Sequence, residues 1–240
     1  VTAEILEATL LGTQFRLNLG TESVVTRTRL IGRHNVANCL AAAAAAAHLG
    51  STPDQIARGI AGLVSVPGRM EPIEGGQPFS VFVDYAHTED ALRHAIQALR
   101  PLTSRRIICV FGAGGDRDRT KRPLLGRAAN AADLSVITSD NSRSEDPKAI
   151  IEDILVGFRG QRRQPYVEAD RERAIRWALQ HAGPGDAVLI AGKGHETEQI
   201  TGAERQHFDD REVARECLDR LYPSHAGAHV HIPLHNSLPV

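Results

Sequence analysis

Four short polar segments of this 240-residue chain combine carboxylates, arginines, amides and glycines in a way that suits recognition of a charged small molecule. Each segment directly follows an apolar run of strand length. They are Asp84-Tyr85-Ala86-His87-Thr88, the stretch from Gly112 to Arg122, the stretch from Ser139 to Asp146, and Gly192-Lys193-Gly194-His195-Glu196. Because the carboxyl ends of parallel strands meet at one edge of a sheet, we expect the four segments to form one site.

Two arginines and one glutamate in these segments predict a zwitterionic ligand. The guanidinium groups of Arg117 and Arg143 present planar donor forks that suit a carboxylate. Glu196 offers an acceptor for an ammonium group, the alternative being a surface acid. Asp140 and Asn141 are also typical of an Asx turn before a helix, and that structural role is compatible with ligand contact.

Two further side chains of these segments leave their role open. His87 suits either a general base or a group that contacts a nucleotide, and no Ser or Cys partner lies near it in the sequence. Lys193 is one of only three lysines and stands in a glycine turn, so we expect it to face phosphate, the alternative being a surface lysine. The chain carries no Walker A sequence, and Arg117 stands where a dinucleotide-binding loop has its third glycine.

A second group of polar residues lies nearer the beginning of the chain. Asn35 and Asn38 open an Ala-rich, helix-like segment, where an amide could either cap the helix or contact a ligand. Arg69, in the turn Pro67-Gly68-Arg69, either closes that turn or reaches a phosphate from a domain boundary.

The apolar pattern predicts an α/β fold in which a mostly parallel sheet is covered by helices on both faces from residue 79 onward. Strands are predicted at 79–83, 106–111, 134–138 and 186–191, with a weaker one at 165–168. Helices are predicted at 90–99, 123–131, 147–158 and 171–181, followed by a hairpin at 198–208 and a helix at 210–222.

The first part of the chain has a different pattern, which we expect to be poor in core strands. Residues 4–30 alternate only in part and predict short antiparallel strands broken at Gly20-Thr21. Two helices are predicted at 35–49 and 55–63, and the stretch 67–78, with three prolines and three glycines, is typical of a linker.

Composition narrows the classes of protein. The 28 basic and 29 acidic side chains nearly cancel, which argues against a general binder of nucleic acid or of membrane surfaces. Three cysteines without a close pair fit a reducing compartment. No apolar run approaches the roughly 18 to 20 residues of a membrane span, and no secretory signal is present, so we expect a cytoplasmic protein.

Taken together, the motifs resemble the Mur ligases of bacterial cell-wall synthesis, especially the members that add meso-diaminopimelate. The resemblance runs from about Gly32 to Leu221, and the order and spacing of its motifs are highly specific. The motifs are GxHNxxN at 32–38, Gly68-Arg69-Met70-Glu71, DYAHT at 84–88, GGDRD and KRP between 114 and 123, DNxR at 140–143 with Glu145-Asp146-Pro147, and GKGHE at 192–196. Two residues depart from this pattern: Ser142 stands where the diaminopimelate-adding members usually have proline, and Glu89 replaces the proline that usually follows DYAHT.

The resemblance implies a domain organisation and a set of contacts. Residues 1–75 would be the end of the family's central ATPase domain, residues 76–222 its Rossmann-like amino-acid-binding domain, and residues 223–240 a disordered tail. Contacts to meso-diaminopimelate would come from Arg117, Asp140, Asn141, Ser142, Arg143, Gly192 and Glu196. The ATP side would hold Asn35, Asn38, Arg69, Asp84 and His87.

The resemblance also implies a reaction. In this family ATP and Mg²⁺ phosphorylate the D-glutamate carboxylate of UDP-N-acetylmuramoyl-L-alanyl-D-glutamate, and the amine of meso-diaminopimelate attacks the acyl phosphate. The family's phosphate loop, magnesium ligands and UDP-binding domain would precede residue 1, so we expect no metal ligands in this chain and no turnover by the chain alone. The complete enzyme is expected to be a monomer.

Two other classes of function remain open. One is a non-catalytic module that binds an amino acid, and the other is a lysine-adding or folylpolyglutamate-type ligase. The DNxR and GKGHE strings disfavour the folate-type enzyme, and Arg143 favours diaminopimelate over lysine by the same resemblance.

Overall fold

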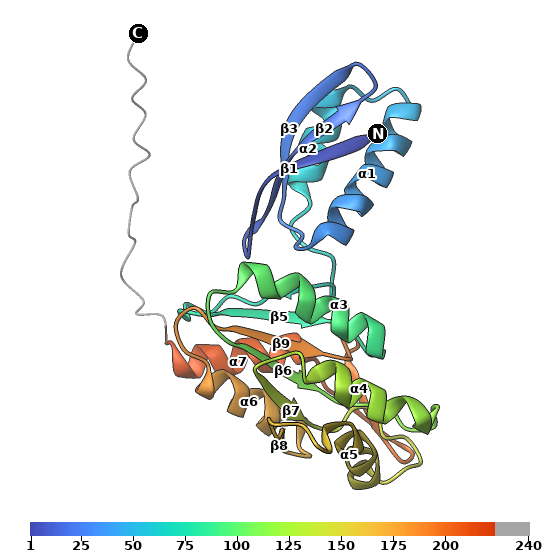
Figure 1. Cartoon of the computed structure of the whole chain (residues 1–240), viewed down its shortest axis with the longest axis vertical. Helices are drawn as coiled ribbons and strands as arrows, with labels where there is room; N and C mark the ends of the chain where they lie inside the picture. Colours follow the sequence, from blue (N-terminus) through green and yellow to red (C-terminus); the bar gives the residue numbers. More distant parts are fainter. Residues whose placement is uncertain (224–240) are drawn as a thin grey trace.

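The computed structural model describes residues 1–223, which form an N-terminal antiparallel sheet with two helices and a C-terminal α/β unit (Figure 1). The predicted tail lies outside the described residues apart from Pro223. Over the described range, no helix has the length and apolar character needed to cross a membrane.

The N-terminal sheet is better formed than the sequence pattern predicts. Its strands β1 (Thr2–Thr9), β2 (Gly12–Leu19) and β3 (Glu22–Thr28) pair in the order β1-β2-β3, and each is seven or eight residues long. Phe15 and Leu17 are fully buried beneath α1 (Arg33–His48) and α2 (Pro53–Gly62). The predicted antiparallel strands and their break at Gly20-Thr21 are confirmed, but the expectation that this part is poor in core strands was wrong. Leu10 and Leu11 occupy the first turn and hide it in the apolar pattern.

The predicted linker also contains a strand. Glu71 and Pro72 form β4 (Glu71–Pro72), which pairs antiparallel with β5 (Ser80–Asp84) at the edge of the second sheet. Proline is tolerated there because an edge strand does not need every N–H for pairing. The C-terminal sheet thus begins before the linker ends.

The C-terminal unit confirms the predicted fold class. Its other strands are β6 (Ile107–Phe111), β7 (Leu134–Ile137), β8 (Tyr166–Val167) and β9 (Ala187–Ala191). The order is β4-β5-β9-β6-β7-β8, and every pairing except β4 with β5 is parallel. β9, the last strand of this sheet in chain order, therefore lies between β5 and β6. The loop that follows β9 is thus brought to the middle of the sheet edge.

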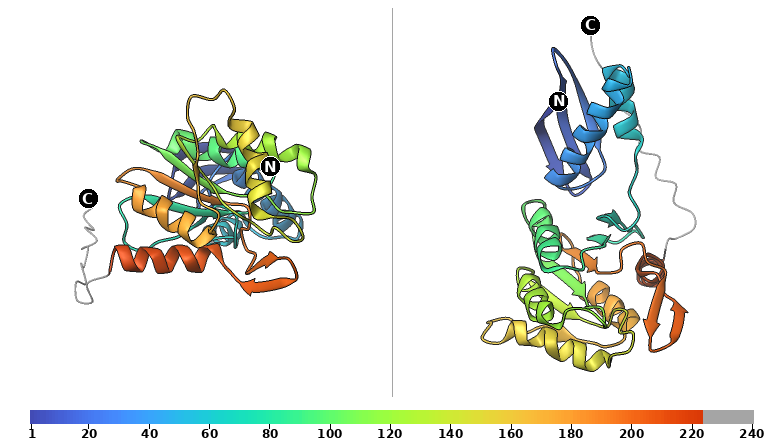
Figure 2. Two further views of the ribbon diagram at one scale, coloured as in Figure 1. Left: turned by 90° about the horizontal axis from the view of Figure 1, so that it is seen from below. Right: turned by 90° about the vertical axis from the view of Figure 1, so that its right-hand side faces the viewer.

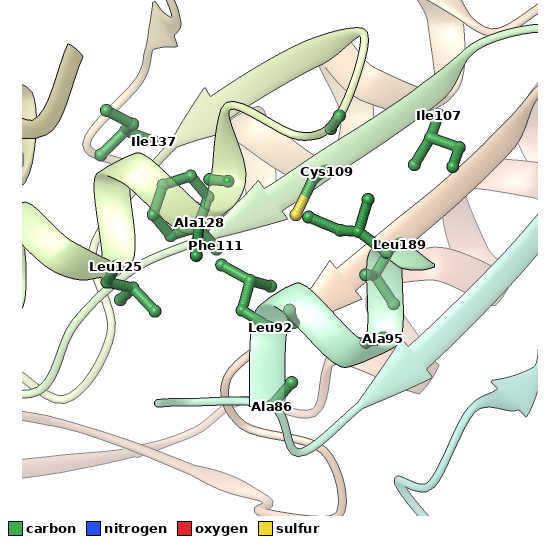
Figure 3. Packing of buried hydrophobic residues seen from close by; sticks show 14 of the residues in the cluster. Ala86, Leu92, Ala95, Ile107, Cys109, Phe111, Leu125, Ala128, Ile137 and Leu189 are labelled. Atoms are coloured by element: carbon green, nitrogen blue, oxygen red, sulfur yellow. The ribbon is translucent and has the colours of Figure 1, made fainter. Parts of the chain in front are cut away.

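Helices cover both faces of this sheet (Figures 1 and 2). α3 (Glu89–Leu99), α4 (Arg122–Ala129) and α5 (Pro147–Leu155) pack on one face, and α6 (Arg171–His181) and α7 (Asp210–Leu221) pack on the other. All five side chains of β6 are buried, because they alternate between the two cores. Cys109 and Phe111 contact the α3 side, as Figure 3 shows, whereas Ile108 and Val110 contact the α6 side.

Shorter elements complete the unit. A hairpin of β10 (Glu198–Thr201) and β11 (Glu204–His207) follows β9, as the sequence predicts. Single turns of 3₁₀ helix lie at Arg100–Leu102, Arg119–Lys121 and Val156–Phe158.

Candidate functional site

The four polar segments meet at the carboxyl edge of the parallel sheet. They line a cleft of about 580 Å³, here called the smaller cleft. Of the residues predicted to form the site, those on its lining are His87, Arg117, Asp140, Asn141, Arg143, Gly192 and Glu196. Ser142 is buried beside them without lining the cleft, and its hydroxyl has no hydrogen-bond partner among the described residues. The fold therefore gathers side chains that lie more than 100 positions apart in the sequence.

Two glycines allow two of these loops to approach each other closely. The Gly115 N–H donates to the Asn141 carbonyl at 2.8 Å. A Cβ atom at Gly115 would lie 1.8 Å from the Ser142 carbonyl oxygen, and one at Gly112 would lie 2.5 Å from the Thr138 carbonyl oxygen. These glycines thus serve packing between loops.

Arg143 is held firmly in the cleft wall. Its backbone is in the left-handed region, with φ of 50°, which is unusual for a residue with a side chain. Its N–H donates to the Ile200 carbonyl at 3.1 Å, and its Nη1 donates to the Gly115 carbonyl at 2.8 Å. Arg117 is exposed and donates to the neighbouring Asp116 carbonyl at 3.1 Å. The cleft therefore has one fixed and one less constrained guanidinium.

Acidic side chains also line the cleft. Asn141 Nδ2 donates to Glu196 Oε2 at 2.9 Å, and Asp140 is only 7% exposed. Gly192, with φ of 117°, leaves room for this carboxylate, because a Cβ there would lie 2.8 Å from Asp140 Oδ2. The cleft thus combines guanidinium donors with carboxylate acceptors, as a zwitterionic ligand requires.

Lys193 does not lie where a phosphate-facing residue should be. Its side chain is fully buried and lines neither cavity described here. Its ammonium donates to Asn141 Oδ1 at 3.2 Å and also to the Glu198 carbonyl. The expectation that it faces phosphate is therefore corrected. The side chain instead points inward, toward Asn141 and the first residue of β10.

A buried ion pair behind the cleft was not anticipated from the sequence. Arg171 Nη2 lies 2.7 Å from Asp210 Oδ2, and both side chains are fully buried. Arg171 also donates to the Ala191 carbonyl at 3.0 Å and the Ser139 carbonyl at 3.2 Å. It therefore joins the segment that follows β7 to the last residue of β9. The available signal was an arginine in the first turn of a helix, where the helix dipole disfavours positive charge.

A second unanticipated pair ties the loop of Arg117 to the loop of Arg143. Arg122 is 2% exposed and lies 2.7 Å from Glu145 Oε1. The Asp116 N–H donates to the same carboxylate at 2.6 Å. Hydrogen bonds from the Arg122 guanidinium and this N–H lower the pKa of Glu145 to about 2. Glu145 is therefore ionised at neutral pH.

A larger cavity, of about 1130 Å³, lies between α3 and the N-terminal unit. Four of the five residues assigned to the ATP side line it, namely Asn35, Asn38, Arg69 and Asp84, and Arg33 and His34 join them. His87 instead lines the smaller cleft. The structure thus divides the predicted residues between two neighbouring spaces.

Asp84 and Asn35 also have clear structural roles at this cavity. The Asp84 carboxylate accepts from the Met70 N–H at 2.7 Å and from the Ala86 N–H at 2.9 Å. Burial raises the pKa of Asp84, and those two donors oppose the shift. This carboxylate holds the turn that carries Arg69, whose guanidinium lies 5.0 Å from the Tyr85 ring centroid. Asn35 Nδ2 donates to the Ile31 carbonyl at 2.8 Å, so its amide does not cap α1, whose N-cap is Gly32.

The chemistry available for metal binding is limited. Within residues 1–223, no group of three or more His, Cys, Asp or Glu side chains is arranged to hold a metal ion. The ionisable groups of the site are instead engaged with arginines, amides and backbone N–H groups.

Comparison with known proteins identifies the family. Residues 68–194 match the model of the Mur ligase, glutamate ligase domain. A UDP-N-acetylmuramoyl-L-alanyl-D-glutamate--2,6-diaminopimelate ligase from Solibacter usitatus is 53% identical over 86% of this chain and 42% of that protein. An enzyme of the same name from Geobacillus kaustophilus is 47% identical over 91% of this chain and 45% of that protein.

A solved structure supports the same family assignment. A structure of UDP-N-acetylmuramoyl-L-alanyl-D-glutamate--2,6-diaminopimelate ligase has a TM-score of 0.70 and 37% identity, covering 91% of this chain and 45% of that chain. The chain spans less than half the length of the relatives described here. The domain match and the level of identity together show that this chain belongs to the Mur ligase family.

Proposed function

We propose that the smaller cleft binds meso-diaminopimelate and that this chain is the amino-acid-binding part of a ligase joining it to UDP-N-acetylmuramoyl-L-alanyl-D-glutamate. The observation that carries the proposal is the pairing, in one cleft, of Arg117 and Arg143 with the linked side chains Asn141 and Glu196. Relatives about 50% identical carry the name of that ligase, which supports the choice of ligand.

In this proposal the cleft orients the amino acid by its charges. Arg143 and Arg117 receive a carboxylate, and Asp140 and Glu196 receive an ammonium group. The fixed backbone of Arg143 and the hydrogen bond from Asn141 to Glu196 hold both sides before the ligand arrives. Such preorganisation places a nucleophilic amine without a cost of ordering the site, which is the main contribution that a binding domain makes to ligation.

The larger cavity is the proposed nucleotide side. Asn35, Asn38 and Arg69 line it and present amide and guanidinium groups suited to a nucleotide and its phosphates. Bound ATP would supply the phosphoryl group that activates the acceptor carboxylate. Mg²⁺ finds no cluster of three suitable ligands within residues 1–223, so no residue is assigned to it. We place the domain boundary before β4, because that strand pairs with β5.

Calorimetric titration of the chain with meso-diaminopimelate, L-lysine and L-glutamate tests the proposal. We expect meso-diaminopimelate to bind most tightly of the three. Glu196→Gln should weaken its binding by about 10- to 100-fold, the range expected for one charge-assisted hydrogen bond. Glu204→Gln is the matched control, because Glu204 is exposed on β11. Preference for lysine would indicate a lysine-adding enzyme, and preference for glutamate a folate-type enzyme. If Glu196→Gln bound meso-diaminopimelate as tightly as the unmodified chain does, the assignment of Glu196 to the ammonium group would be contradicted.

A further inference from the structure

We propose that Lys193 is a positioning residue that sets the orientation of Asn141 and Glu196 in the smaller cleft. This inference rests on the proposed function, since it concerns how the same cleft recognises its amino acid. Lys193 reaches the ligand only through its neighbours, because its side chain is fully buried and does not line the cleft.

The Lys193 ammonium lies where three segments of the chain meet. Its Nζ is 3.2 Å from Asn141 Oδ1, in the loop after β7, and 3.7 Å from Glu196 Oε2, in the loop after β9. It also donates to the Glu198 carbonyl at the start of β10. A buried ammonium with oxygen acceptors on three segments fixes their relative positions, because leaving any of its donors unpaired would be costly.

Hydrogen-bond polarity then dictates which way the Asn141 amide faces. An ammonium group only donates, so the amide must present its oxygen to Lys193. The Ile200 N–H donates to that same oxygen at 2.9 Å. With Oδ1 occupied by two donors, Nδ2 is directed toward Glu196 Oε2 at 2.9 Å. The reversed amide would place its NH₂ group against two donors and its oxygen against a carboxylate.

The Glu196 carboxylate therefore receives both an amide donor and a nearby positive charge. Around Lys193 stand the charged groups Asp140, Asp210, Glu196 and Arg171, from the loops after β7 and β9, from α7 and from α6. Burial lowers the pKa of Lys193, and the three carboxylates oppose that shift. One oxygen of Glu196 is thereby held by Asn141, which orients the carboxylate on the lining of the cleft.

The first test reads the geometry without any ligand. The chain has only three lysines, so ¹⁵N-labelled lysine gives three ammonium signals that single substitutions assign. We expect the Lys193 signal to exchange slowly with water, unlike those of exposed Lys121 and Lys148. In Lys193→Met, the Asn141 side-chain NH₂ signals should shift, whereas Lys148→Met should leave them unchanged. A fast-exchanging Lys193 signal in the unmodified chain would overturn the inference even if the variant did not fold.

The second test measures recognition. Lys193→Met should weaken the binding of meso-diaminopimelate by about 10- to 100-fold. The binding of pimelate, which lacks both ammonium groups, should weaken much less. A general loss of structure would lower both affinities together, so a reduced ratio of the two affinities is the specific sign of lost positioning. Lys148→Met is again the control.

The outcomes separate the two proposals. If the unmodified chain bound no meso-diaminopimelate, the proposed function would fail, and the Asn141 signals would still decide the role of Lys193. If Lys193→Met kept the affinities for both ligands and left the Asn141 signals in place, the positioning role would be wrong while the proposed function stood.

Discussion

Replacing Gly115 with alanine should separate the two loops that form the wall of the smaller cleft. A Cβ atom at this position would lie 1.8 Å from the Ser142 carbonyl oxygen, whereas ordinary contact begins near 3.4 Å. The loops must therefore move apart by about 1.6 Å, the difference between these two distances. The obstructing atoms belong to the backbone, so no side-chain rotation can relieve the contact.

That movement would break two hydrogen bonds. One joins the Gly115 N–H to the Asn141 carbonyl at 2.8 Å, and the other joins Arg143 Nη1 to the Gly115 carbonyl at 2.8 Å. A neutral bond contributes about 0.5–1.5 kcal/mol and a charged one about 1.5–3 kcal/mol, so the bonded arrangement should lose about 2–4.5 kcal/mol. Because Asn141 and Arg143 both line the cleft, we expect meso-diaminopimelate to bind at least about 30-fold more weakly.

Calorimetric titration of Gly115→Ala with meso-diaminopimelate measures this effect. Gly59→Ala is the matched control, because a Cβ there meets nothing within 4 Å and its helix should gain about 0.5–1 kcal/mol of stability. Unchanged affinity in Gly115→Ala, with a folded protein, would refute the idea that close packing of these loops shapes the site.

Two further predictions concern the two ion pairs that connect segments of the site, Arg171 with Asp210 and Arg122 with Glu145. Asp210→Asn leaves the buried Arg171 charge without its partner. In urea titrations at pH 7 this change should lower the free energy of unfolding by about 3–5 kcal/mol. A loss below about 1 kcal/mol would contradict a stabilising role of this ion pair. The pKa of Glu145 is about 2 in the folded chain and lies below its ordinary value of 4.5, so its contribution is present above pH 4.5 and disappears as the pH falls toward 2. The stability difference between the unmodified chain and Glu145→Gln should therefore shrink over that interval, whereas exposed Glu152→Gln should show no such trend.

The parallel sheet and the meeting of the four segments could be predicted because both follow from local patterns. Continuous apolar runs such as Ile107–Phe111 mark strands buried on both faces, and the polar residues after each run must lie at one edge. The cap of α3 is equally local, since Thr88 accepts from the Ala91 N–H. The departure at Glu89 is accommodated there, because its side chain pairs with Arg93 one turn later.

The remaining features depend on contacts between distant segments, which a single sequence does not encode locally. The burial of Lys193 is one example, because its acceptors Asn141 and Glu198 lie outside the glycine turn and the turn itself does not indicate them. Arg171 and Asp210 are 39 positions apart, and neither lies in one of the four polar segments. Asp84 and His87 are only three positions apart in the sequence, yet Asp84 lines the larger cavity and His87 lines the smaller cleft.

The most direct test of the account is to map amide chemical shifts while the chain is titrated with meso-diaminopimelate. The account predicts saturable shifts at Arg117, Asn141, Arg143, Gly192 and Glu196, which all line the smaller cleft. Residues that line only the larger cavity, such as Asn38 and His94, should remain unchanged. Shifts confined to the larger cavity, or no saturable shifts at millimolar ligand, would contradict the claim that the smaller cleft is the amino-acid site.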